Sequence, residues 1–119
     1  MLFRSVPQVR AGRLRAIGVT SLARAPGAND IPTLDESGLK GFEAVQWYGL
    51  LAPANTSRDI IDKIYRDASA ILRSPDVATR MTSDGALVVA STGEQFAAFI
   101  KSETAKWAKV VKAAGIVLE

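Results

Sequence analysis

The chain has 119 residues, enough for one domain with a modest hydrophobic core. Hydrophobic residues make up 48% and charged residues 23%, which is typical of a folded globular protein and argues against disorder. The chain has no cysteine and no histidine, which excludes disulfides, zinc-thiolate sites, thiol nucleophiles and histidine-based catalysis. The net charge of +3 is mild, and we expect no nucleic-acid partner.

The N-terminal residues 1–7 lack the apolar core of a signal peptide. No apolar run approaches the roughly 20 residues needed to cross a bilayer. We therefore expect a soluble chain that carries no export signal. Arginines cluster near the start and lysines near the end, which indicates solvated surface or, alternatively, attraction for an anionic partner or small anion.

The first residues predict a short helix followed by a strand. Ser5–Gly12 is typical of a short helix with Gly12 as its C-terminal cap. Alternating side chains in Arg13–Ser21 predict a strand, mostly buried from Ala16 onward. A loop rich in proline and glycine follows.

The next stretch predicts a capped turn and a second strand. Thr33 and Glu36 have the spacing of a capping box, in which each side chain accepts from the other residue's amide. The helical turn that they begin ends at Gly38. Phe42–Leu51 has a strand-like pattern, and Pro53 ends it.

Two helices are predicted in the middle of the chain. Ser57–Arg73 has apolar residues at helical spacing, with Thr56 or Ser57 available to cap it. A second helix begins at Pro75, capped by Ser74, and runs to about Asp84.

The last third predicts a strand, a long helix and a final extended piece. Ala86–Ala90 is a short apolar strand, and Ser91 with Glu94 has the spacing of a second capping box. The long helix that follows ends at Gly115, and Ile116–Leu118 is extended. The order predicts one α/β domain over residues 1–119, with three to four short strands and four to five helices.

Few residues offer catalytic or metal-binding chemistry. The close acidic pairs, Asp35/Glu36 and Asp59/Asp62, are typical of helix surfaces rather than of metal or acid-base sites. No nucleophile elbow or glycine-rich phosphate loop occurs, so we expect no enzyme activity and no cofactor or metal. Serine-lysine catalysis through Ser37 or Ser102 stays formally open.

The candidate ligand-binding residues are Thr20, Ser21 and Trp47. Thr20 and Ser21 end a predicted strand, where loop hydroxyls commonly meet ligands in open α/β sheets. Their alternative role is to cap the strand end and turn. Trp47 is a candidate pocket wall, or else packs in the core or against another lobe. Arg24 can pair with a carboxylate or lie exposed, and Trp107 is expected in the core.

Several segments together resemble one known family. They are Gly12–Ser21, Arg24, Ile31–Gly38, Gly41–Glu43, Trp47–Pro53, Glu94–Phe96, Lys106–Lys112 and Ala114–Ile116. In this order and spacing they resemble the C-terminal region of the Bug, or TctC-like, extracytoplasmic solute-binding receptors. The resemblance covers nearly the whole chain.

This resemblance implies part of a type II periplasmic-binding-protein fold, in which two α/β lobes close on a ligand. It implies small organic acids or amino acids as ligands, held by backbone amides, hydroxyls and bridging water. It also implies a periplasmic receptor that delivers its ligand to a membrane permease. Asn55-Thr56-Ser57 replaces the usual Gly-Thr-Pro turn, and the receptor's N-terminal part is lacking, so we expect a truncated form.

Three hypotheses remain open. In the first, the chain is a receptor fragment that self-associates as a homodimer to cover an exposed sheet edge or apolar face. In the second, it is a free-standing small α/β module that binds an organic anion or forms dimers without a transport role. In the third, it is an enzyme on an unrelated scaffold.

Overall fold

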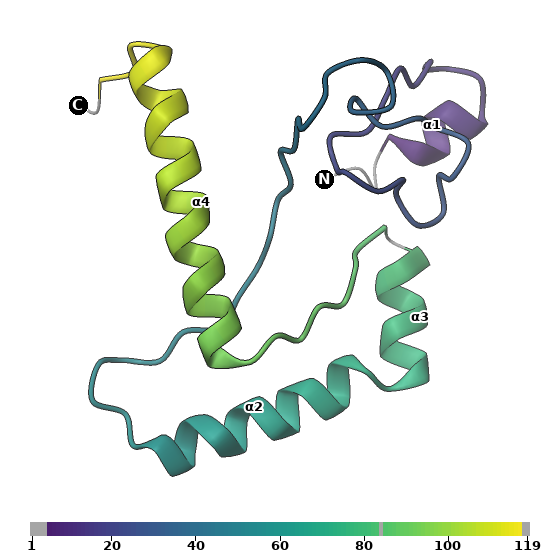
Figure 1. Ribbon diagram of the computed structural model, residues 1–119. Helices are drawn as coiled ribbons and strands as arrows, with labels where there is room; N and C mark the ends of the chain where they lie inside the picture. The colour runs from purple at the N-terminus through teal and green to yellow at the C-terminus, as the bar shows by residue number, and fades with distance from the viewer. Residues whose placement is uncertain (1–4, 84, 118–119) are drawn as a thin grey trace. The chain divides into compact units, whose positions relative to one another are not determined.

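The computed structural model describes residues 5–83 and 85–117 (Figure 1). Its contacts divide the chain into two units, Met1–Val88 and Val89–Glu119, which are described separately below. The single domain over residues 1–119 stays a prediction. No helix in the described ranges is long and apolar enough to cross a membrane.

The first unit begins with α1, Val6–Arg10. Its last turn is closed at Ala11, and Gly12 follows in the left-handed region with φ of +70°. The helix predicted over Ser5–Gly12 is therefore confirmed, with its regular part shorter than expected. Glycine suits this end of the helix because a side chain is strained at positive φ.

A small core forms where the loop after α1 folds back on itself. Its buried apolar members are Val19, Ala25, Ala28 and Ile31. Thr33, which is fully buried, pairs with Val19 through an isolated parallel bridge. The bridge joins two segments of a loop-rich region, so residues 19–33 are held in place without a sheet.

The three to four predicted strands are not confirmed. Within residues 5–83 and 85–117 the only β pairing is the Val19–Thr33 bridge, and Figure 1 shows no strand arrows. Side-chain alternation predicts which residues suit a strand, but a strand also needs a neighbouring ladder of hydrogen bonds. Ala90 has φ of 47°, outside the extended region, so the last residue of the strand expected over Ala86–Ala90 does not have strand geometry. Leu118, the end of the last predicted strand, lies outside the described residues.

The first unit continues with α2, Arg58–Leu72, and α3, Pro75–Ser83, which contact each other. Both helices are where the sequence predicts them. Ser57 is the N-cap of α2, but its side chain makes no capping hydrogen bond. The Thr56 hydroxyl donates instead to the Pro53 carbonyl at 2.8 Å, so the predicted side-chain cap of α2 is wrong.

The second unit contains α4, Gly93–Ala113. Its capping box is formed by Thr92 and Gln95, one residue later than predicted. The capping pattern occurs twice in overlapping register here, and the sequence alone does not select between them. The helix ends at Ala113 with Ala114 as its C-cap, and Gly115 follows with φ of +64°, as expected.

Trp107 on α4 is not a core residue. Its side chain is 41% exposed, and its indole Nε1 donates to Glu103 Oε2 at 2.9 Å. Lys106 forms an ion pair with the same carboxylate and lies 5.6 Å from the centre of the indole ring. The apolar spacing correctly predicted a helix here, but the Trp107 indole forms a polar contact with Glu103 on this helix instead of packing in a core.

Candidate ligand-binding loop

Thr20 directly follows the bridge residue Val19 and is exposed. Its carbonyl accepts a hydrogen bond from the Ala44 amide at 2.9 Å. Its hydroxyl makes no hydrogen bond to the residues that the structure describes. The backbone at Thr20 is therefore held in place, and the role of its hydroxyl in ligand binding stays a prediction.

Ser21 is partly buried, and its Oγ donates to the Ala23 carbonyl at 2.6 Å. This bond is the turn-capping role that the sequence left as the alternative. With the hydroxyl proton committed to Ala23, the Ser21 oxygen can accept a hydrogen bond but not donate one to a carboxylate. Its proposed role as a ligand donor therefore requires rotation of the hydroxyl.

Trp47 lies in the irregular segment that contacts the loop. Ala44, which donates to Thr20, precedes Trp47 by three residues, at most about 10 Å of chain. The Trp47 side chain is 41% exposed. The fold therefore brings the Trp47 segment near Thr20, and the role of the ring as a pocket wall stays a prediction.

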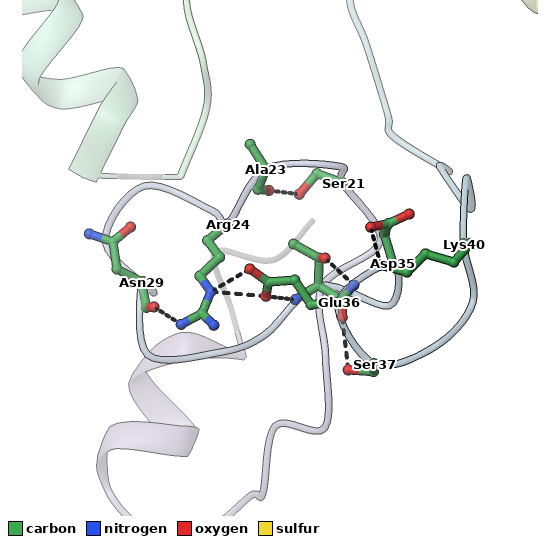
Figure 2. A network of polar contacts seen from close by, with 9 residues as sticks. Ser21, Ala23, Arg24, Asn29, Asp35, Glu36, Ser37 and Lys40 are labelled. Atoms are coloured by element: carbon green, nitrogen blue, oxygen red, sulfur yellow. Dashed lines mark hydrogen bonds and ion pairs between the residues drawn. The ribbon is translucent and has the colours of Figure 1, made fainter.

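Arg24 pairs with a carboxylate of the protein itself. Its Nε lies 3.0 Å and 3.2 Å from the two carboxylate oxygens of Glu36, and its Nη1 donates to the Asn29 carbonyl at 2.8 Å (Figure 2). Arg24 is half exposed. Both sequence-based interpretations therefore apply in part: Arg24 is surface-accessible, and it binds a carboxylate that belongs to Glu36.

Glu36 also completes the predicted capping box. Its Oε2 accepts from the Thr33 amide at 2.9 Å, and Thr33 Oγ1 accepts from the Glu36 amide at 3.0 Å. The Thr33 amide, followed by the Arg24 guanidinium, lowers the pKa of Glu36 below its usual value. The sequence predicted the capping box but missed the link to Arg24, because a pair 12 residues apart leaves no periodic signal.

Asp35 closes the turn on its other side. It accepts from the Gly41 amide at 2.7 Å and pairs with Lys40 at 3.2 Å. The Gly41 amide, followed by Lys40, lowers the pKa of Asp35 below its usual value. The Ser37 hydroxyl donates to the Thr33 carbonyl at 2.8 Å. Asp35 and Glu36 therefore each have structural partners within the turn.

The charges of this network are paired internally. Arg24 is paired with Glu36 and Lys40 with Asp35, so each of these two cations has a carboxylate partner within the protein. Among the described residues no cluster of carboxylates can hold a metal ion. A surface hollow on α2 is lined by Asp59, Asp62, Tyr65 and Arg66. Its two carboxylates do not suit an anionic ligand.

Sequence comparison matches the tripartite tricarboxylate transporter family receptors, TctC, over residues 1–116. BugT of Bordetella pertussis is 33% identical over 111 residues, which are 93% of this chain and 34% of BugT. The UPF0065 protein of the tcbD-tcbE intergenic region of Pseudomonas sp. strain P51 is 36% identical over 104 residues, 87% of this chain and 31% of that protein.

Two solved structures are similar in fold. The periplasmic binding protein BugD matches with a TM-score of 0.80 and 38% identity, over 94% of this chain and 38% of BugD. The R. palustris protein Rpa4515, solved with adipate, matches with a TM-score of 0.82 and 30% identity, over 98% of this chain and 39% of that one.

These likenesses define the class as part of a periplasmic-binding-protein-like fold. The chain belongs to the Bug/TctC family of tripartite tricarboxylate transporter receptors. It spans about a third of the length of the first curated relatives that it matches.

Proposed function

We propose that this chain is a ligand-facing part of an extracytoplasmic receptor that binds small carboxylates for tripartite tricarboxylate-type uptake. The observation that carries the proposal is the family match over residues 1–116. The similar R. palustris protein was solved with adipate, a dicarboxylate, which supports carboxylates as the ligand class. In this proposal the chain binds and presents a ligand and has no catalytic role.

The proposed ligand contacts are Thr20, Ser21 and Trp47. A carboxylate offers only acceptors, so it needs donors that are not already committed. The exposed Thr20 hydroxyl is such a donor. The backbone around it is held by the hydrogen bonds of Val19 to Pro32 and Leu34 and by the bond from the Ala44 amide to the Thr20 carbonyl. Since Arg24 and Lys40 are each paired with a protein carboxylate, we assign recognition to hydroxyl and amide groups of the loop rather than to these two exposed cations.

The proposal also extends to the complete receptor. There the segments around Arg13–Ser21, Phe42–Leu51 and Ala86–Ala90 would form strands by pairing with the other part of the receptor, which gives the three to four strands of a two-lobed cleft. The receptor would act in the periplasm and pass its ligand to a membrane permease. This extension of the proposal rests on the longer relatives, of which this chain matches about a third.

A titration followed by nuclear magnetic resonance tests the ligand class. We expect millimolar adipate to shift the backbone amides of Thr20 and Ser21 and the Trp47 indole saturably. Hexane-1,6-diol is the matched control, because it has the same carbon chain without carboxylates. Equal shifts with the diol, or no saturable shift with adipate, would remove the support for a carboxylate site.

Exposed apolar residues favour self-association of this chain as a second proposal. Tyr48, Leu50 and Leu51 are 85%, 75% and 80% exposed in one segment without a ladder partner. Exposed apolar residues without a paired neighbour are typical of surfaces that bind another chain. The alternative of a free-standing small module therefore includes a homodimer, which a measurement of solution mass tests.

A further inference from the structure

The loop of residues 19–24, here the hydroxyl loop, is held at its first two residues by backbone hydrogen bonds. Val19 donates to the Pro32 carbonyl and accepts from the Leu34 amide, both at 2.9 Å. Thr20 accepts from Ala44. The start of the loop is therefore tied to two other segments of the chain.

The end of the hydroxyl loop is tied by one side chain, that of Arg24. Its Nη1 binds the Asn29 carbonyl at 2.8 Å and its Nε binds the Glu36 carboxylate at 3.0 Å. Within the loop, the Ser21 bond to Ala23 is local and joins it to no other segment. Arg24 thus supplies the side-chain hydrogen bonds that tie the far end of the loop to other segments, next to Ala25 of the small core.

Glu36 gives the Arg24 contact a firm anchor. Its carboxylate is held by the amide of Thr33, which is fully buried and pairs with Val19 across the bridge. These contacts form a closed series. Val19 pairs with Thr33, Thr33 with Glu36, and Glu36 with Arg24, and the backbone of the loop joins Arg24 back to Val19. Figure 2 shows Arg24 between Asn29 and Glu36 in this circuit.

We propose that Arg24 is a positioning residue, which holds the hydroxyl loop through Asn29 and Glu36 so that Thr20 faces the ligand. This inference rests on the function proposed above. Arg24 binds no ligand in this proposal; its Nε and one Nη1 proton bind Glu36 and Asn29 and hold the loop. A planar guanidinium can reach a carbonyl and a carboxylate together, whereas a lysine ammonium is a single point on a flexible stem.

Two measurements on the same chain test the proposal. For Arg24→Gln we expect faster hydrogen exchange at the amides of residues 20–24 and a dissociation constant for adipate raised about fivefold, as expected for loss of a charge-assisted contact. Arg24→Lys should recover little of either effect. Glu36→Gln is the matched variant, because glutamine keeps the acceptor for the Thr33 amide but removes the charge opposite Arg24.

The outcomes separate the two proposals. If the unmodified chain binds adipate and Arg24→Gln changes neither loop exchange nor affinity by more than about twofold, the positioning role is wrong. A slow-exchanging loop in Arg24→Gln with lost affinity would also overturn it, since Arg24 would then contact the ligand itself. If the unmodified chain binds no adipate, the proposed function falls first, and this inference falls with it. Should Arg24→Gln unfold, Glu36→Gln supplies the same comparison.

Discussion

Thr33 and Glu36 each accept a hydrogen bond from the other's backbone amide, at 3.0 Å and 2.9 Å. This reciprocal pair lies beside the buried Val19–Thr33 bridge and carries the Arg24 contact. It therefore joins the small core of the first unit to the loop that we propose binds the ligand.

Removing the Thr33 hydroxyl should destabilise the first unit. For Thr33→Ala we expect a loss of about 1–2 kcal/mol, because the Glu36 amide loses its acceptor inside a packed site. Chemical denaturation measures the change. Thr33→Ser should retain most of the stability because it keeps the oxygen. A Thr33→Ala chain as stable as the original would show that this capping box contributes nothing.

Stability should fall in acid because two carboxylates have lowered pKa values. The pKa values of Asp35 and Glu36 lie below their usual values of 3.8 and 4.5. For such groups the stabilising contribution is fully present above the unfolded pKa and is lost as the pH falls through the folded pKa. We expect denaturation midpoints to be flat above about pH 5 and to drop below about pH 4.

Glu36→Gln separates the Glu36 contribution from the rest. The variant cannot titrate at residue 36, so its midpoint should depend less steeply on acid than that of the original chain. An unchanged acid profile would assign the loss of stability to other carboxylates, such as Asp35 and Asp67, whose pKa values are also lowered.

Gly27 and Gly18 should respond differently to alanine. Gly27 has φ of +75° with open space around it, so Gly27→Ala should cost about 1–2 kcal/mol through backbone strain alone. At Gly18 an added Cβ would lie 2.8 Å from Leu34 Cδ2, the far end of a flexible side chain that can move. We expect Gly18→Ala to cost less in denaturation experiments. The reverse order would mean that Leu34 cannot adjust.

Self-association should depend on the exposed segment that contains Tyr48 and Leu50. Light scattering after size-exclusion chromatography should give a mass above that of the monomer, and Leu50→Lys should lower it because a charge opposes burial. Lysine at the exposed helical position Ala105 is the matched control for added charge. A monomer at every concentration would contradict the homodimer proposal.

The sequence predicted the helices and turns well because their signals are local. The helix over Ser57–Arg73 and the turn begun by Thr33 each depend on residues within a few positions of one another. Even the error at α4 is local, a shift of one residue between two overlapping capping patterns. Predictions that rest on residues far apart fared worse, and the strand count is the main example.

For the site, the sequence selected Thr20 and Ser21 from their place after a predicted strand. It did not reveal that Ser21 is committed to Ala23, nor that Arg24 is engaged by Glu36. The Arg24–Glu36 pair depends on how the loop folds back, which no periodic pattern records, whereas the Ser21 bond to Ala23 is the local turn-capping alternative. The binding roles of Thr20, Ser21 and Trp47 stay predictions that the titration above will test.

By itself, the sequence determined the helical segments, the capped turn at Thr33 and membership of a receptor family, because helix periodicity, cap spacing and motif order are written along the chain. Only the tertiary structure decided which groups are already satisfied. It brought Arg24 to Glu36 across 12 residues and Val19 to Thr33 across 14, because folding back a loop places side by side residues that share no local pattern. That arrangement pairs the Arg24 cation with Glu36 and leaves the exposed Thr20 hydroxyl without a hydrogen bond to the described residues.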